Sequence, residues 1–384
     1  MKLRRVLVVA QKEAREILRD RIYFALAFLL PVVLMLVFGY GMTQEVQNVP
    51  IAIVDYDRSA LSRDYAHRFI DSRYFEFRGY VDSVIAAEPL LLDGKVRAVI
   101  VLPEYFQERL MSGLPVDIQT LLDGTFTYRL RTVDGYVQAI NSAASAEIQT
   151  QYLVRHAGVS STRAQTLLQP LQIQTRYLYN QELKEIWSVA PALIMFILTL
   201  TSPLLMALSV VREKESGTIY NIYASTIRRN EYLAGKLLPN VVVSFINGIV
   251  LVLLTVLYFK APLKGDVVFF LVAMLIYVIW ATSVGLLISV IVNTQIAAIL
   301  ITVILAMVLV MQFSGMLIPV SSMTGANYLI AHGMAPMHFN DVVTQTFLKG
   351  GGLNASWREL AALIAFMFGF LLLGYLLFHK QSKT

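Results

Sequence analysis

The sequence predicts a polytopic α-helical membrane protein with six transmembrane helices and an extracytoplasmic α/β domain inserted between helices one and two. Of the 384 residues, 57% are hydrophobic and only 15% are charged, whereas about 25% of the residues of soluble domains are charged. The hydrophobic residues form blocks long enough to cross a bilayer, and basic residues flank these blocks. A stretch of soluble-like composition separates the first two blocks.

The spans follow from the length of the apolar blocks. A helix needs about 20 apolar residues to cross the hydrocarbon core, because lipid offers the backbone no hydrogen-bond partner. Pro31 lies inside the first block and predicts a kink. The stretch between Asp266 and Asp341 has no charged residue and is too long for one span, so we divide it at the polar residues 293–295. The predicted spans are residues 22–42, 186–211, 237–259, 267–292, 296–320 and 360–378.

Lys and Arg residues beside the spans set the orientation, because cytoplasmic loops are enriched in them. They accumulate before the first span, between the second and third spans, and in the tail 379–384. Both termini are therefore predicted to be cytoplasmic. The net charge of +6 reflects these flanking residues, so nucleic-acid binding is not expected.

Residues 1–21 are predicted to form a cytoplasmic amphipathic helix. Apolar side chains between Leu3 and Leu18 repeat at helical spacing, with the charged side chains on the other face. Such a helix can lie on the inner leaflet or pack on the protein itself, and both can hold at once. Acidic residues interrupt the basic lead and no small-residue cleavage site follows, so a cleaved signal peptide is not expected.

Residues 43–185 are predicted to form the extracytoplasmic α/β domain with a helical stalk. Strand-like runs alternate with amphipathic helices, which indicates an α/β layer. Ser59 is expected to cap the first helix. The expected strands are residues 51–54, 74–80, 98–102 and 116–122; the expected helices are 60–70, 81–92 and 104–111, and the stalk helices are near 128–156 and 162–179.

No catalytic or metal-binding residue is predicted. Asp55 and Asp57 follow a strand, where some phosphotransfer enzymes place a nucleophile and a general acid, but a second acidic cluster that would hold magnesium is missing. A turn at the strand end followed by a helix cap is the simpler interpretation. The histidines lack metal-ligand spacing, and cysteine is absent, which excludes disulfides and thiolate metal sites.

The predicted spans contain no ionisable residue that could use an ion gradient. Their polar side chains are mild ones, such as Asn247 and Gln312, which can join helices or touch a substrate. A phosphate-binding loop is also missing, because the glycine-lysine pairs at Gly94 and Gly235 are not followed by serine or threonine. Energy would therefore come from a partner protein.

Residues 212–236 are predicted to be the cytoplasmic coupling region, and the segment 212–224 within it is where such a partner would dock. It starts with charged residues, and Ile219, Ile222 and Tyr223 then recur at helical spacing. A short amphipathic helix of this kind can lie in a groove of another protein. A solvated loop whose charges only fix the topology explains these residues equally well.

Motifs along the whole chain resemble one family. Glu213-x-Glu215-x-Gly217-Thr218 follows the second span, Arg229-x-Glu231-Tyr232-x-x-Gly235-Lys236 precedes the third, and Ile51-Ala52-Ile53-Val54-Asp55-x-Asp57-x-Ser59 opens the external domain. Ser314-Gly315 with Pro319, and Pro336 with His338-Phe339, come later. In this order they resemble the ABC type-two exporter permeases, in particular the multidrug-type permease subunits with a large extracytoplasmic domain.

The resemblance implies a transport subunit that is not itself an enzyme and that exports drugs, lipids or other hydrophobic or large substrates through a bacterial inner (cytoplasmic) membrane. This chain would hold no cofactor, because a separate ATP-binding ABC subunit would bind ATP and magnesium. A second permease copy would complete a homodimer, or a closely related chain a heterodimer, and some members also use a periplasmic adaptor and an outer-membrane channel. The coupling residues would be Arg212, Glu213, Glu215, Gly217, Thr218, Ile219, Ile222 and Tyr223.

Polar and glycine residues in and after the later spans are candidates for contact with a substrate. Candidate substrate-path residues are Asn247, Gln312, Ser314 and Gly315, and residues 321–359 are expected to be extracytoplasmic or re-entrant. Two other classes stay open: a membrane-anchored sensor or receptor whose external domain binds a ligand, and a lipid enzyme that acts through the acidic pair in the external domain.

Overall fold

The structure of the chain, a computed structural model, divides into two compact units. The first contains Met1–Gln44 and Arg176–Thr384, and the second contains Glu45–Thr175. We call them the membrane unit and the α/β unit. The structure describes residues 3–42, 48–125, 127–168, 178–182, 184–220 and 225–378.

The described part of the membrane unit contains six helices that are long and apolar enough to cross a bilayer. The first is continuous from Arg21 to Gly41 and comprises α2 (Arg21–Phe24), the π-helical turn η1 (Ala25–Leu29) and α3 (Leu30–Gly41). The others are α9 (Ile186–Glu215), α11 (Arg229–Leu253) with its π-helical extension η2 (Leu254–Tyr258), α12 (Val267–Ile291), α13 (Gln295–Phe313) and α16 (Leu353–Leu377). The shorter elements are α1 (Leu3–Arg19), η3 (Val320–Ser322), α14 (Ala326–His332), α15 (Ala335–Thr344) and η4 (Gln345–Lys349).

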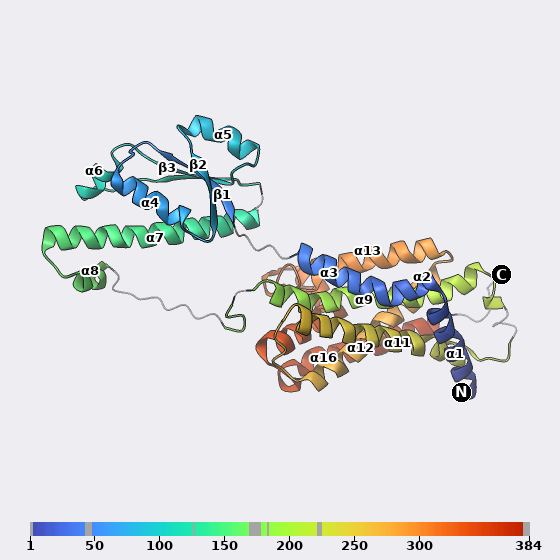
Figure 1. Ribbon diagram of the computed structural model, residues 1–384. Coiled ribbons are helices and arrows are strands. Elements are labelled where there is room, and N and C mark those ends of the chain that lie inside the picture. Colours follow the sequence, from blue (N-terminus) through green and yellow to red (C-terminus); the bar gives the residue numbers. More distant parts are fainter. Residues whose placement is uncertain are drawn as a thin grey trace. The chain divides into compact units, whose positions relative to one another are not determined.

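Helix α9 is the central helix of the membrane unit (Figure 1). It packs against α3, α11, α12, α13 and α15, and 94% of its most apolar stretch is buried, compared with 11% for α16. A helix that is apolar on all sides is stable only when protein or lipid covers it. Because α9 touches most of the bundle, a displacement of this helix reaches several others.

Some helix boundaries differ from the prediction. Helices α11 and α16 begin earlier, at Arg229 and Leu353, because their first turns are polar and do not contribute to an apolar block. The first turn of α11 is completed by Glu231, whose carboxylate accepts a hydrogen bond from the backbone N–H of Arg228 (3.0 Å). Helix α13 ends before residue 320, at Phe313, because Gly315 adopts a left-handed conformation (φ +81°).

The π-helical turn η1 ends two residues before Pro31, the residue at which the sequence predicts a kink. Proline has no N–H group, so the carbonyl of Ala27, four residues earlier, lacks its usual helical donor. The side-chain amide of Asn247 in α11 donates a hydrogen bond to this carbonyl over 2.5 Å. Asn247 is only 2% exposed, so this hydrogen bond joins α11 to the first span inside the bundle.

Replacing Asn247 by alanine is expected to lower the free energy of unfolding by about 1–3 kcal/mol, because the buried Ala27 carbonyl loses a donor. Pro31→Ala supplies a backbone N–H that can reach the same carbonyl, so Asn247→Ala should cost less in a Pro31→Ala background. Thermal unfolding of the four proteins in detergent measures both costs. Equal costs would show that the Ala27 carbonyl is not the decisive partner of Asn247.

The α/β unit contains a four-stranded sheet with helices on both faces (Figure 1). β1 is parallel to β2 and β3, whereas β3 and β4 are antiparallel, and the order is β2-β1-β3-β4. Helices α4, α6 and α7 pack on one face of the sheet and α5 on the other. The bounds are β1 (Val49–Asp55), α4 (Ala60–Ile70), β2 (Phe75–Tyr80), α5 (Val84–Leu92), β3 (Ala98–Leu102), α6 (Phe106–Met111), β4 (Gln119–Leu122), α7 (Thr127–Ala157) and α8 (Ser161–Leu168).

The central strands are buried on both faces, as is usual for parallel strands between helices. Ile51 and Ile100 face α4 and α7, whereas Ala52 and Val99 face α5. The strands predicted from the sequence are present, but the fourth begins at Gln119 instead of residue 116. Residues 116–118 run beside a cavity instead.

The acidic pair at the end of β1 forms a turn and supports a helix cap, as predicted. Oδ1 of Asp55 accepts a hydrogen bond from the backbone N–H of Asp57 (3.1 Å), and Oδ2 accepts one from the Ser62 hydroxyl (2.7 Å). Ser59 caps α4 by accepting from the N–H of Ser62 (3.0 Å). Asp57 in turn accepts from the N–H of Gln107 in α6 (3.1 Å). These carboxylates therefore stabilise local structure.

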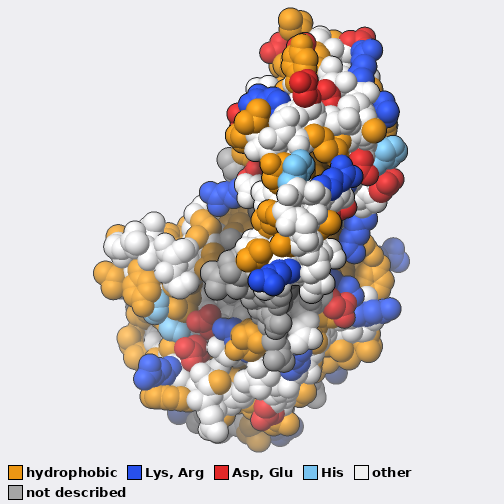
Figure 2. Space-filling model, turned by 90° about the vertical axis from the view of Figure 1, so that its left-hand side faces the viewer, with side chains coloured by type: hydrophobic (Ala, Val, Ile, Leu, Met, Phe, Trp, Pro, Cys, Tyr) orange, Lys and Arg blue, Asp and Glu red, His pale blue; other side chains and the backbone are white. Residues whose placement is uncertain are grey.

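Figure 2 shows one face of the α/β unit, on which acidic, basic and hydrophobic side chains are mixed.

Candidate functional site

Helix α1 packs on the protein with one face and exposes apolar side chains on another. It approaches α11 closely because residue 235 is glycine: a Cβ atom there would lie 2.6 Å from Cβ of Val9. The prediction that α1 packs on the protein is therefore confirmed. The exposed apolar side chains could still contact lipid, so the prediction that α1 lies on the membrane surface stays a prediction. The buried residues of α1 are Val6, Val9, Glu13 and Ile17, and its exposed large apolar residues are Leu3, Leu7, Val8 and Leu18.

The packed face of α1 brings Glu13 into a buried cluster of ionised side chains. Lys236 of α11 is 1% exposed, and its ammonium group pairs with Glu13 and with Glu213 of α9, the latter at 3.0 Å. The same group donates a hydrogen bond to the carbonyl of Ser209 (3.0 Å), and Glu213 accepts one from the Tyr232 hydroxyl (2.7 Å). Buried charges are tolerated only when they are paired and hydrogen-bonded. Groups from α1, α9 and α11 together meet this condition.

Two further ion pairs connect the N-terminal region to the end of α9. Nζ of Lys12 lies 2.5 Å from Glu213 and 3.4 Å from Glu16. Partial burial opposes the charge of Lys12, but the two carboxylates outweigh it and raise the pKa of its ammonium group. Arg212 lies 2.5 Å from Asp20. Backbone hydrogen bonds from the start of α2, together with Arg212, lower the pKa of the Asp20 carboxyl.

The next two charged residues of α9 contact two other helices. Nζ of Lys214 donates to backbone carbonyls at the end of α12, among them that of Val292 (3.2 Å). The carboxylate of Glu215 accepts a hydrogen bond from the backbone N–H of Gln295 (2.8 Å), the first residue of α13. Helix ends leave these carbonyl and N–H groups without internal partners, and the helix dipoles favour the same signs of charge.

Residues 212–215 thus form a charged junction at the end of α9, which we call the α9 junction. Successive residues of a helix are about 100° apart, so four in a row face different sides of the helix. Here they reach the start of α2, α1 with α11, the end of α12 and the start of α13. A movement of this single turn therefore acts on helices all around the bundle.

The chain leaves α9 through Ser216 and Gly217. Gly217 has a φ of +71°, the left-handed conformation in which glycine ends many helices. The hydroxyl of Thr218 lies 2.9 Å from that of Ser216 and closes the turn. This geometry separates the α9 junction from the rest of the predicted docking region, residues 218–224, which we call the docking segment.

The docking segment is described in part. Ile219 and Tyr220 have helical backbone; Ile219 is buried, and Tyr220 is 62% exposed. The predicted coupling residues Ile222 and Tyr223 lie outside the described residues. The exposed tyrosine is a side chain that a partner can reach without displacing the protein's own core.

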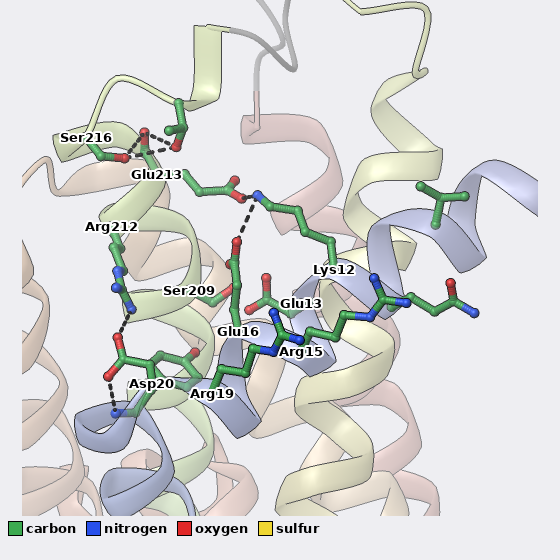
Figure 3. Close-up of a pocket in the computed structure, with 14 residues that line it drawn as sticks. Lys12, Glu13, Arg15, Glu16, Arg19, Asp20, Ser209, Arg212, Glu213 and Ser216 are labelled. Carbon is green, nitrogen blue, oxygen red and sulfur yellow. Dashed lines mark hydrogen bonds and ion pairs between the residues drawn. The ribbon is translucent and has the colours of Figure 1, made fainter.

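A groove of about 760 Å³ opens between α1 and the end of α9. Figure 3 shows Lys12 reaching from α1 to Glu213, and Arg212 extending along α9 toward the start of α2. Arg15 and Arg19 also line the groove, are exposed, and form no ion pair with any residue that the structure describes. The groove therefore gives a partner access to the α9 junction past exposed positive charge.

Three carboxylates in this site lie close together. Oxygen atoms of Glu13, Glu16 and Glu213 are all within 4.8 Å of one another, a spacing that can hold a metal ion. Lys12 and Lys236, however, already pair with these carboxylates. Two ammonium groups thus supply the positive charge that a metal would bring, and the ion pairs account for the arrangement.

The four candidate substrate-path residues have different surroundings. Asn247 bonds to the first span, as described above. Ser314 is buried, and its carbonyl accepts a hydrogen bond from the side-chain amide of Asn340 (3.1 Å), which joins the end of α13 to α15. Gly315 continues this turn, whereas Gln312 is exposed on α13. The contacts of Asn247 and Ser314 are structural, and a role of the four in a substrate path stays a prediction.

The sequence reasoning missed the partners of the predicted coupling residues. Glu13 was expected on the solvent side of α1, yet it is 2% exposed because it faces Lys236. One signal could have found the pair: Lys236 directly precedes an apolar span, where a charge needs a counter-charge. The identity of that counter-charge, 223 residues away, is not visible in local sequence.

Comparisons with known proteins agree with one another. The family model described as "ABC-2 family transporter protein" matches residues 21–376. "Probable multidrug ABC transporter permease YbhS" of Escherichia coli (strain K12) is 25% identical over 90% of this chain and 89% of its own length. "Probable multidrug ABC transporter permease YbhR" of the same organism is 26% identical over 94% of each chain. "Inner membrane transport permease YhhJ", also of Escherichia coli (strain K12), is 25% identical over 100% of this chain and 99% of its own.

Proposed function

This chain belongs to the ABC-2 family of transporter proteins, and from that premise we propose that it is the permease subunit of an ATP-driven exporter. A separate ABC ATPase subunit would bind ATP and magnesium and supply the energy. The buried charges of the site support this division of work: Glu13, Glu213 and Lys236 are paired with one another near the helix ends, so none is free to carry an ion across. The cargo would be a drug, a lipid or another hydrophobic or large compound. The names of two relatives, each a probable multidrug permease, support the first of these.

The α9 junction carries the proposal. The docking segment follows the junction directly, and Tyr220 within it is exposed. A force applied to this segment reaches α9 through Gly217 and then α1, α11, α12 and α13 through the ion pairs and hydrogen bonds of residues 212–215. The four charged residues would therefore transmit movement within the permease, whereas the exposed part of the segment would contact the ATPase.

We expect the conformational change that drives export to begin when two ATPase subunits bind ATP and close on each other. Closure would displace the docking segment, tilt α9 and open a path toward the outside between two copies of the permease. The ATPase can drive this change only if it contacts the two conformations of the permease differently. The second copy would be identical or closely related.

The topology follows from the same proposal. The α9 junction and α1 would face the cytoplasm, with both termini on that side of a bacterial inner membrane. The α/β unit would then be extracytoplasmic, where a periplasmic adaptor and an outer-membrane channel could join it. Labelling of single cysteines introduced into this cysteine-free chain would test the sidedness of each segment.

Two substitutions should separate docking from transmission. Tyr220→Ala should lower the affinity for the ATPase by about tenfold or more, as is typical of a central aromatic residue in an interface. Glu215→Ala removes the contact with α13 and should leave ATPase binding unchanged while export falls. Co-purification with the ATPase and ATP-dependent export into vesicles measure the two effects. Tyr328→Ala, which removes an exposed tyrosine from α14, is the matched control for the first variant.

The proposal fails if the purified chain moves a cargo across liposomes with no ATPase present. It also fails if Tyr220→Ala and Tyr328→Ala bind the ATPase equally well. The relatives' names give no support to the sensor or to the lipid enzyme.

A further inference from the structure

A cavity of about 650 Å³ lies within the α/β unit. Its walls come from Tyr65 of α4, from α6, from residues 113–118, which run from α6 to β4, and from α7. Pockets that bind small molecules have volumes of roughly 300–1,000 Å³. The cavity thus has the volume of a ligand site, and it belongs to a part of the chain that the coupling mechanism does not use.

The walls of the cavity are largely apolar. Phe106 and Leu110 contribute from α6, Val116 and Ile118 from the strand-like run before β4, and Ile148 from α7. Phe106 is 1% exposed and belongs to the core of the unit, so this wall is fixed by packing. The apolar part of a ligand would be buried against this wall. Removal of apolar surface from water is the main source of affinity in such sites.

A hydrogen-bonding pair interrupts the apolar wall. The hydroxyl of Tyr65, which is 3% exposed, donates to the side-chain oxygen of Asn141 in α7. Burial raises the pKa of Tyr65, so its hydroxyl stays protonated and remains the donor. This fixes the amide of Asn141 with its NH₂ group unused, since that group donates no hydrogen bond to a residue that the structure describes. A polar group of a ligand can accept from it.

The charge of the lining is one-sided. Among the lining residues that the structure describes, Asp117 is the single charged one, and none is Lys, Arg or His. A carboxylate at the wall attracts cations and repels anions. Asp117 is exposed, so water and salt weaken this effect. The lining therefore discriminates against anionic molecules.

We infer that this cavity binds a neutral or cationic amphipathic small molecule, with its apolar part against α6 and residues 116–118 and a hydrogen-bond acceptor toward Asn141. The inference goes beyond the proposed export function, because binding in the α/β unit needs neither the ATPase nor the docking segment. Loss of one function would thus leave the other measurable.

Two fluorescent probes that differ by one sulfonate group test the inference. N-phenyl-1-naphthylamine is neutral, and 1-anilinonaphthalene-8-sulfonate is its anionic counterpart. The full chain is placed in lipid nanodiscs, and the signal of empty nanodiscs is subtracted. We expect saturable binding of the neutral probe and about threefold to fivefold weaker binding of the anionic one, because only the latter brings a charge of the wrong sign to the exposed Asp117.

Substitutions on the two walls locate the binding. Ser145→Trp fills the cavity from α7, and Leu114→Trp fills it from the segment between α6 and β4. Both residues are exposed lining residues, so the core is untouched. Each should weaken binding of the neutral probe by about tenfold or more, since the apolar wall is lost to the ligand. Ser142→Trp, the same change on α7 outside the cavity, should leave it unchanged.

Asp117 and Asp82 allow a matched pair of substitutions that remove one negative charge each. Asp117→Asn should narrow the difference between the two probes, whereas Asp82→Asn, at an exposed aspartate outside the cavity, should not. Probe binding that survives both tryptophan substitutions overturns the inference. The inference is also overturned if Leu114→Trp abolishes binding of a partner protein but leaves probe binding intact. That result would show that the cavity receives a segment of a protein.

Discussion

Lys236→Met is expected to lower the free energy of unfolding by about 3–5 kcal/mol, because buried carboxylates lose the ammonium group that compensates them. Glu13 is the residue most affected: it is 2% exposed, and Lys236 is its ion-pair partner among the described residues. Glu213 keeps Lys12 and the Tyr232 hydroxyl. Thermal unfolding in detergent measures the loss of stability. Binding of the ATPase is measured on the same variant.

A second substitution should recover most of this loss. In Lys236→Met with Glu13→Leu, both members of the pair are replaced by apolar side chains, and exchanging a complete buried ion pair in this way is often neutral for stability. The double variant should unfold close to the temperature of the parent protein. Should it unfold as early as the single variant, the unpaired carboxylate of Glu13 cannot be the cause of the loss.

Gly235→Val is expected to have the second largest effect, about 1–3 kcal/mol of destabilisation from overpacking. A Cβ at this position would lie 2.6 Å from Cβ of Val9 and 3.1 Å from the carbonyl oxygen of Val6. The clash is with Cβ and with backbone, so rotation of the Val9 side chain cannot relieve it. Helix α1 would have to move away from α11 and would carry Glu13 away from Lys236.

Gly369→Val is the matched control for this variant. Gly369 lies inside α16, and a Cβ there would meet no heavy atom within 4 Å. Both variants exchange a glycine for valine inside a helix, so the change in helix propensity is shared between them. Comparison of their unfolding temperatures isolates the contact between α1 and α11, and equal temperatures would show that this contact contributes nothing.

The fold could be predicted to the extent that it depends on local pattern. Apolar blocks predicted where the long helices lie, alternating runs predicted the strands, and the hydroxyl of Ser59 predicted the cap of α4. Helix ends were less predictable, because α11 starts in a polar turn and α13 stops at the left-handed Gly315. Neither feature changes the hydropathy of a block.

The site depended on contacts between distant segments and was predicted only in outline. The sequence placed Glu213 in a segment that meets a partner protein, but the structure shows it 5% exposed and paired with Lys236 and Lys12. Its neighbours along the chain are charged and polar, so nothing local distinguishes a buried glutamate from an exposed one. The counter-charges come from Lys12 of α1 and Lys236 of α11. Only the packing of these helices against α9 shows this.

The charged turn at the end of α9 also limits how the chain can vary in length. One inserted or deleted residue upstream of Arg212 would rotate the following turn by about 100° and shift it by about 1.5 Å along the axis. After an insertion, Glu213 would point at the carbonyl end of α12 and Lys214 at the amide end of α13, and each would bring a charge of the wrong sign. A single substitution along α9 changes contacts only where it occurs. An insertion or deletion between the buried part of α9 and its charged end rotates all four charged residues away from their partners, so the number of residues between them is constrained.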